Sequence, residues 1–233
     1  MSAPATLHLR PHADVAERVL LPGDPGRALR LAQQLLDAPK MLNHNRGLWG
    51  YSGEAADGLP LTIQSTGMGG PSAAIVAEEL IALGARRLVR LGTCGALAGS
   101  LELGRLVVAE GVLPEDGASR ALGATGTLRP DPDLGAALRE SAGEAATAGL
   151  VVSADLFYDP DPERAARWTA AGALAVEMEA ATLLAVAGRH GAAAACLLAV
   201  SDLVADRTRI GAEELEAAER ELGRAGAAAL AAL

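Results

Sequence analysis

Aromatic side chains are scarce in this sequence. Phe, Trp and Tyr together make up 2% of the 233 residues, whereas 50% of the residues are apolar. Ala, Leu and Val must therefore fill the core, which suits Ala-rich helices packed on strands better than an aromatic-rich β-sandwich. A chain of this length can bury one substantial core, so we predict a single α/β domain over residues 1–233.

Cysteine, positive charge and long apolar runs are also scarce. Cys94 and Cys196 are the only cysteines and form no CxxC or mixed Cys/His motif, so we expect neither a disulfide framework nor a metal site. The net charge of -9 argues against nucleic acid as a partner, because such proteins need a basic surface. No run is long enough to cross a bilayer, and residues 1–12 lack the apolar stretch of a signal peptide. We therefore expect a cytoplasmic protein with no membrane partner.

Short apolar runs predict strands, and several of them end in turn-forming residues. The predicted strands are 19–21, 61–65, 88–91, 106–109, 150–153, 174–176 and 196–200. The predicted helices are 27–36, 71–83, 133–148, 162–171 (with Asp161 as its N-cap), 180–190 and 213–233, and the longest loop is 114–132. This order favours a central mixed, mostly parallel sheet flanked by helices, with a site at the carboxyl ends of the strands.

Two arginines lie where an anion could be held. Arg27 ends the segment LPGDPGR, in which glycines and the start of a helix offer backbone N-H groups to a phosphate. An ordinary turn with a solvated arginine would give the same pattern. Arg90 lies inside an apolar run that is followed by Thr93 and Gly95, and a buried guanidinium needs an anionic partner. That partner is either a bound anion or an acidic side chain of the protein.

Carboxylates follow two of the predicted strands. Glu177 and Glu179 share one face if the strand continues through them and diverge if a helix has begun. They are suited to accept hydrogen bonds from ribose hydroxyls, or simply to face the dipole of the helix. Asp202 closes a strongly apolar strand, where it could protonate a leaving group or cap a turn. Together these groups are what cleavage of a glycosidic bond by phosphate requires.

An ordered series of motifs resembles the nucleoside phosphorylase family, which includes the hexameric bacterial purine nucleoside phosphorylases and the uridine phosphorylases. The motifs are PGDPGR at 22–27, NRGLWGYSG at 45–53, STGMGGPSAAI at 65–75, VRLGTCGA at 89–96, SADLFY at 153–158, VEMEAA at 176–181 and VSD at 200–202. The resemblance spans nearly the whole chain. It implies the nucleoside phosphorylase fold, inorganic phosphate as co-substrate, no cofactor, no metal, and a homo-oligomer, a hexamer built as a trimer of dimers.

The resemblance also implies a role for each matching residue. Phosphate would be held by Gly23, Arg27, Arg90 and Thr93, with Arg46 reaching into the site of a neighbouring subunit. The nucleoside site would comprise Met68, Met178 and Glu179 at the ribose, Phe157 and Val176 at the base with Glu177 beside it, and Ser201. His8 from the neighbouring subunit would reach the ribose 5'-hydroxyl, with His12 close by in sequence. Asp202 would protonate N7 of the purine as the bond to ribose breaks.

One position departs from the family pattern. Members that use an aspartic acid as proton donor generally pair it with an arginine about thirteen residues further on, and Leu215 stands near that offset here. Arg207, Arg209 and Arg220 are the available substitutes, and the sequence leaves the choice open.

Several activities fit the motifs to different degrees. We predict a purine nucleoside phosphorylase acting on ribonucleosides or deoxyribonucleosides. Uridine phosphorylase is the nearest alternative, which EDGAS at 115–119 favours, but residues 158–176 are too few for the uracil-reading segment of that branch. A methylthioadenosine phosphorylase, a hydrolytic nucleosidase and a non-catalytic nucleoside-binding protein are weaker alternatives.

Overall fold

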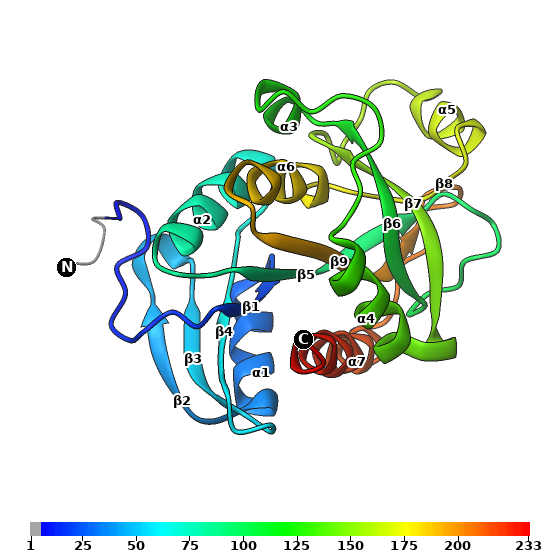
Figure 1. Ribbon diagram of the computed structural model, residues 1–233. Coiled ribbons are helices and arrows are strands. Elements are labelled where there is room, and N and C mark those ends of the chain that lie inside the picture. The colour runs from blue at the N-terminus through cyan, green and yellow to red at the C-terminus, as the bar shows by residue number, and fades with distance from the viewer. Residues whose placement is uncertain (1–5) are drawn as a thin grey trace.

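The computed structural model describes residues 6–233 and contains one nine-stranded sheet with helices on both sides (Figure 1). The strands are β1 (Arg18–Pro22), β2 (Leu36–Asn43), β3 (Gly50–Ala55), β4 (Pro60–Gln64), β5 (Arg87–Ala96), β6 (Leu106–Glu115), β7 (Ala146–Ala154), β8 (Ala173–Glu177) and β9 (Ala193–Leu203). Of the nine strand pairings in residues 6–233, five are parallel. The predicted mixed, mostly parallel sheet is therefore confirmed.

Half of the sheet is open and the other half closes on itself. Strands β2, β3 and β4 extend outward from β1, whereas β5, β8, β7, β6 and β9 pair in that order and β9 pairs again with β5. The β5 and β9 strands run parallel along nearly their whole lengths. Their side chains are buried on both faces, which explains the continuous apolar runs in these two strands.

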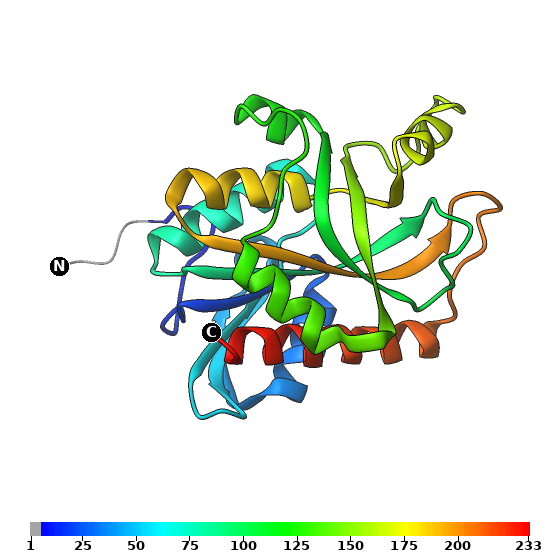
Figure 2. The same ribbon diagram turned by 45° about the vertical axis from the view of Figure 1, so that its right-hand side comes forward.

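Two layers of helices cover the sheet. On one side lie α1 (Pro25–Leu35), α4 (Pro132–Ala142) and α7 (Ala212–Ala231), and on the other lie α2 (Gly70–Ala82) and α6 (Ala180–His190) (Figure 2). Each layer packs on its own cluster of buried Leu, Val and Ala side chains. The short helices α3 (Gly117–Ala121) and α5 (Arg164–Ala170) project beyond the closed half of the sheet (Figure 2). Two 3₁₀ turns, η1 (Asn45–Gly47) and η2 (Gly143–Ala145), complete the elements of residues 6–233.

The first helix shows how local chemistry fixes an element beside the sheet. Asp24 is the N-cap of α1, and its carboxylate accepts a hydrogen bond of 2.6 Å from the backbone N-H of Arg27. Pro25 occupies the first turn, where no backbone donor is needed. The chain therefore leaves β1 through a tight turn and enters α1 directly, which places Arg27 beside the carboxyl end of β1.

The seven predicted strands are present, but some other expectations were wrong. Strands β2 and β3 were not predicted, because most side chains of β2 are exposed and β3 contains two glycines. The helix predicted over 133–148 ends at Ala142, since Gly143 adopts a positive φ of 56° and the following residues join β7.

Two short helices also differ from expectation. The predicted loop 114–132 contains α3. The helix expected from Pro162 begins at Arg164 with Glu163 as its N-cap, because the Asp161 carboxylate accepts the backbone N-H of Glu163 at 3.0 Å in a turn that precedes the helix. No helix within residues 6–233 is both long and apolar enough to cross a membrane.

Candidate active site

A cavity of about 1340 Å³ opens where β1, β5, β7, β8 and β9 end. Twelve of the residues expected at the site line it: Gly23, Arg27, Met68, Arg90, Thr93, Phe157, Val176, Glu177, Met178, Glu179, Ser201 and Asp202. They come from motifs far apart in the sequence, and the parallel strands bring them to one edge of the sheet. The cavity therefore lies where the strand endings predicted it.

Arg90 lies at the centre of the charged part of this cavity. Its Nε donates a hydrogen bond of 2.8 Å to Glu177, and its Nη2 is paired with Glu179. The third nitrogen, Nη1, is buried without a hydrogen-bond partner in residues 6–233, and it lies 4.0 Å from where a Cβ on Gly23 would be. The alternative of acidic partners is therefore confirmed, and one donor of Arg90 stays free beside the glycine turn, so an anion at that place remains a prediction.

The charge of Arg90 is maintained despite its burial. Burial alone would lower its pKa, but the negative charges of Glu179 and Glu177 raise the pKa above its ordinary value. The guanidinium is therefore a permanent cation at a buried position beside the cavity. A buried donor without a partner is costly, and an anion in the cavity would satisfy it.

The two glutamates converge on Arg90 although the strand ends between them. Glu177 is the last residue of β8, and Glu179 is the N-cap residue of α6. Glu177 also accepts hydrogen bonds from the backbone of Glu179 and Ala180 and from the Ser153 hydroxyl, so its oxygens are fully used by the protein. Of the two glutamates, Glu179 has the oxygens with fewer protein partners.

Glu179 is less completely bonded than its neighbour. It accepts the backbone N-H of Gly69 at 2.5 Å and pairs with Arg90. Burial raises the pKa of Glu179 above its ordinary value, Arg90 opposes this effect, and the charge of Glu177 adds to it. A hydroxyl donor arriving in the cavity would stabilise the ionised form of this carboxylate.

Arg27 reaches the cavity from the first helix. Its Nε donates a hydrogen bond of 2.8 Å to the carboxylate of Glu219 on α7, and its Nη1 donates to the carbonyl of Leu91 at 3.3 Å. Arg27 is buried, so the alternative of a solvated arginine is wrong. Glu219 was not among the residues predicted from the sequence. The available signal was its helical spacing from Leu222 and Gly226, which places it on the buried face of α7.

Asp202 occupies the end of β9 and is partly exposed to the cavity. Its Oδ1 accepts a hydrogen bond of 2.8 Å from the Ser201 hydroxyl. Its Oδ2 lies 2.9 Å from where a Cβ on Gly95 would be, so any side chain at position 95 would displace the carboxylate. Gly95 therefore leaves space for the Asp202 carboxylate at the end of β9.

The three arginines considered as partners of Asp202 lie in two different places. Arg207 and Arg209 line the same cavity as Asp202, whereas Arg220 lines a separate surface pocket beside Arg30. The backbone of Arg209 pairs directly with that of Asp202 in an antiparallel bridge. Its guanidinium carbon lies 5.6 Å from the centroid of the Phe157 ring, in the range of a cation-π contact.

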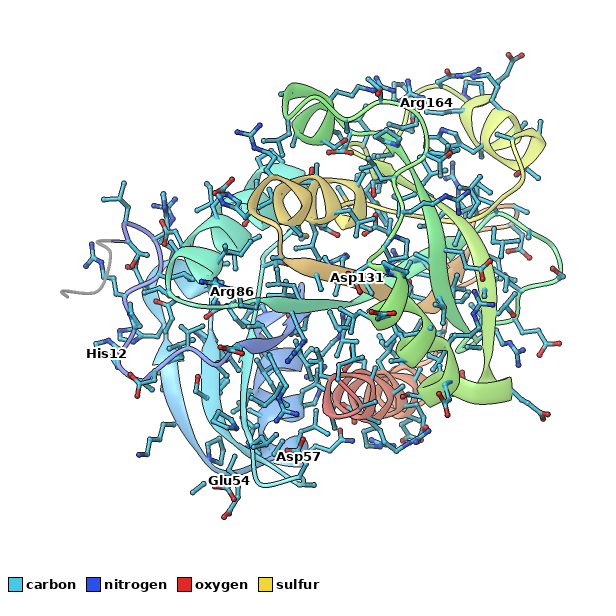
Figure 3. The ribbon with its side chains drawn as sticks, in the orientation of Figure 1. His12, Glu54, Asp57, Arg86, Asp131 and Arg164 are labelled. Carbon is cyan, nitrogen blue, oxygen red and sulfur yellow. The ribbon has the colours of Figure 1, made fainter. Side chains whose placement is uncertain are left out.

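Part of the cavity wall is apolar and open. Met68 is 86% exposed and Phe157 is 56% exposed, so both apolar side chains line the cavity without being covered by the chain. The segment that leads into α5 forms the rim, where Arg164 pairs with Asp159 at 3.0 Å. Figure 3 labels Arg164 at the α5 end of the molecule, far from the turn that carries Asp57.

His8 and Arg46 do not line this cavity. His8 Nδ1 lies 2.8 Å from Glu79 of α2, and Arg46 is exposed in a turn with a positive φ of 58°. The two segments lie side by side, because the side chain of Asn45 donates a hydrogen bond of 2.8 Å to the carbonyl of His8. His12 points elsewhere and stacks on His44, with ring centroids 5.5 Å apart.

Within residues 6–233, no three His, Cys, Asp or Glu side chains are grouped so that they could hold a metal ion. Cys94 and Cys196 are both buried as free thiols. Burial raises the pKa of each thiol well above its ordinary value, which keeps both protonated and unreactive.

Comparison with known proteins agrees with this geometry. Residues 17–233 match the family model described as the phosphorylase superfamily. A guanosine phosphorylase from Halorubrum lacusprofundi is 42% identical in an alignment of 193 residues that covers 80% of this chain and 78% of that protein. A DeoD-type purine nucleoside phosphorylase from Proteus mirabilis is 36% identical in an alignment of 232 residues that covers 94% of each chain. A DeoD-type enzyme from Caldanaerobacter subterraneus is 36% identical over 208 residues, covering 86% of this chain and 89% of its own.

These matches confirm the resemblance that the motifs suggested, and they extend over the strands and loops that form the cavity. The chain belongs to the phosphorylase superfamily.

Proposed function

We propose that this protein is a purine nucleoside phosphorylase, which uses inorganic phosphate to convert purine nucleosides to free base and ribose or deoxyribose 1-phosphate. The observation that carries the proposal is the unpartnered Nη1 of Arg90, which faces the Gly23 turn in the same cavity as Asp202. An anion site and a proton donor in one cavity are the two elements that phosphorolysis needs. The relatives that cover most of the chain carry names of purine or guanosine phosphorylases.

The part of the cavity lined by Gly23, Arg27, Arg90 and Thr93 would bind phosphate and orient it for the reaction. Arg27 and Arg90 would bind the phosphate oxygens, assisted by the Thr93 hydroxyl and the backbone at Gly23. As the bond to the base stretches, the ribose gains oxocarbenium character, and the fixed phosphate stabilises that charge before attacking C1. The arginines contribute mainly by holding phosphate in one geometry, since their other nitrogens are already tied to carboxylates.

The nucleoside would occupy the remainder of the cavity. Glu179 would accept hydrogen bonds from the ribose hydroxyls between Met68 and Met178, sharing its carboxylate with Arg90. The purine would lie between Phe157 and Val176, near Ser201 and Glu177. Asp202 would donate its proton to N7, so that the base leaves as a neutral molecule.

Arg209 is our candidate for the cation that assists Asp202. It lines the same cavity and lies directly across the backbone from Asp202, whereas Arg220 borders a different pocket. Arg207 also lines the cavity, but the backbone bridge with Asp202 is formed by Arg209.

We further propose that the active form is a homo-oligomer, a hexamer arranged as a trimer of dimers, which works in cytoplasmic purine salvage. His8 and Arg46 lie outside the chain's own cavity, which supports roles in the site of a neighbouring subunit. The exposed Met68, Phe157 and Tyr158 side chains at the cavity mouth would be covered in such an assembly.

The test follows base release from inosine, guanosine, adenosine and uridine, with and without phosphate. Phosphate-dependent release from the purine nucleosides is expected, and Asp202→Asn should lower kcat for adenosine by about a hundredfold, in the range of lost general-acid catalysis. Release without phosphate would mean hydrolysis, release from uridine alone would mean a uridine phosphorylase, and no release at all would refute an enzymatic role.

A further inference from the structure

One buried carboxylate outside the cavity contacts two arginines at once. Glu219 of α7 is 4% exposed. Its Oε1 accepts a hydrogen bond of 2.8 Å from Nε of Arg27, and its Oε2 accepts one of 2.5 Å from Nη2 of Arg30. Arg27 and Arg30 are neighbours on one face of α1, so Glu219 ties that face to α7.

The packing of α7 explains how the carboxylate reaches Arg27. Gly223 and Gly226 follow Glu219 at helical spacings of four and seven, on the same face. A Cβ on Gly226 would lie 3.0 Å from Leu91 Cδ2, and one on Gly223 would overlap the Leu31 side chain. The two glycines therefore let α7 approach α1 and β5 closely enough for the Glu219 carboxylate to contact Arg27.

This contact fixes the direction of the Arg27 guanidinium. Nε is bonded to Glu219 and Nη1 to the carbonyl of Leu91, so the planar group cannot turn without losing both bonds. Its Nη2 has no hydrogen-bond partner among residues 6–233, and Arg27 lines the cavity whereas Glu219 does not. The arrangement leaves one edge of the guanidinium available to a ligand.

Arg30 keeps the carboxylate compatible with a bound anion. An unshielded buried carboxylate next to a phosphate site would repel the phosphate, because charges interact strongly where water is excluded. Arg30 is the partly exposed member of the cluster and gives two guanidinium groups to one carboxylate. The cluster therefore stays net positive, and its outer side reaches a surface pocket away from the cavity.

We infer that Glu219 is a positioning residue for phosphate, which orients Arg27 from outside the cavity with Arg30 as its outer support. The inference rests on the proposed function, in which Arg27 binds phosphate. It predicts that Glu219 affects the binding of phosphate and leaves the binding of the nucleoside unchanged.

The test compares Glu219→Gln with Glu216→Gln. Glu216 lies on the same helix and borders the same surface pocket, but it forms no hydrogen bond with Arg27, so the control removes the same charge without the contact. In Glu219→Gln, KM for phosphate should rise about tenfold, while KM for inosine and kcat at saturating phosphate stay within about threefold of the wild type. The control should resemble the wild type in all three parameters.

Other outcomes overturn the inference. An unchanged or lowered KM for phosphate in folded Glu219→Gln would mean that the carboxylate only fastens α7 to α1, or only opposes the anion. Equal rises in both KM values would mean a general disturbance of the site. If Glu219→Gln does not fold, Arg30→Gln replaces it, and a KM for phosphate that does not rise by at least about twofold refutes the role of the cluster.

Phosphate binding by calorimetry separates this inference from the proposed function. If the wild type binds phosphate and Glu219→Gln binds it about tenfold more weakly, the positioning role holds even if no nucleoside is cleaved. If the wild type binds phosphate and Glu219→Gln binds it equally well, the positioning role fails while the proposed function stands. If the wild type does not bind phosphate, both fail.

Discussion

Two buried arginines on neighbouring strands differ in how fully they are bonded. Arg18 begins β1 and is 6% exposed, while Arg90 lies within β5 and is 5% exposed. Arg18 donates from Nε to the Pro60 carbonyl at 3.2 Å and from both Nη atoms to Asp57 at 2.5 and 3.1 Å. Arg90 faces two carboxylates and yet keeps one nitrogen without a partner.

The number of nitrogens without a partner distinguishes Arg90, beside the cavity, from Arg18, which has a structural role. Burial does not distinguish them, because both side chains are buried. Each nitrogen of Arg18 has a partner, two of them through a bidentate pair with Asp57, which Figure 3 labels at the lower end of the molecule. Arg90 is held just as firmly, but its remaining donor faces a cavity. A free donor on a fixed guanidinium, rather than burial or charge, is the feature that indicates ligand binding.

Replacing each arginine by methionine is the strongest way to break the comparison. Arg90→Met should lower kcat/KM for inosine by about a thousandfold, because it removes a fixed donor from the proposed phosphate site. Arg18→Met should retain kcat/KM within about threefold. Steady-state kinetics with thermal unfolding as a folding control would measure both, and a folded Arg90→Met variant with a tenth of wild-type activity would contradict the assignment.

Replacing Arg18 should lower the stability of the fold, although it should leave the activity nearly unchanged. Arg18→Met leaves Asp57 without its cation and the Pro60 carbonyl without its donor, so the free energy of unfolding should fall by about 2 kcal/mol. Urea denaturation of the wild type and of Arg18→Met would measure the loss. The double variant Arg18→Met/Asp57→Asn should recover part of it, and no recovery would mean that Arg18 stabilises by packing alone.

A third arginine sharpens the comparison at the cavity wall. Arg209→Met should lower kcat for adenosine by about tenfold if its charge assists Asp202, while Arg220→Met should leave kcat unchanged. Steady-state kinetics with adenosine would measure both variants. A loss with Arg220→Met alone would reverse the assignment.

The smallest expected effect is the acid sensitivity of the Arg18 and Asp57 pair. The hydrogen bond from Arg18 holds the pKa of Asp57 at about 2, below its ordinary value of 3.8. A carboxylate with a lowered pKa in the folded state stabilises the fold above its unfolded pKa, and this stabilisation is lost as the pH falls from about 4 toward 2.

Because Asp57 is partly exposed, the contribution should be on the order of 1 kcal/mol. Urea midpoints of the wild type and Asp57→Asn at a series of acidic pH values would measure it. The difference between the two proteins should shrink as the pH falls, and a constant difference would contradict the assignment.

The parts of the fold that could be predicted are those whose burial leaves a pattern in the sequence. Strand β9 is buried on both faces and appears as an unbroken apolar run, whereas β2 has five consecutive exposed residues and carries no such pattern. The strand endings with Arg90 and Asp202 could be predicted for the same reason, since each polar residue interrupts or closes an apolar run.

The parts that could not be predicted depend on long-range contacts. Glu219 lies in a helix rich in Glu and Arg, and its spacing from Leu222 and Gly226 indicates an inward-facing position but not its partners. Only the approach of α7 to α1 gives it Arg27 and Arg30 as partners, and no local pattern specifies that approach. The convergence of Glu177 and Glu179 on Arg90 likewise depends on how β8 turns into α6 beside β5.

The contact between Arg27 and Glu219 joins residues that are 192 positions apart in the chain. During biosynthesis, Arg27 emerges from the ribosome long before its carboxylate partner exists, and any earlier fold must hold a guanidinium without its counter-charge. Contacts between residues so distant in sequence carry a large loop-closure entropy and slow the search for the native state. The bond that orients Arg27 can therefore form only after nearly the whole chain has been synthesised.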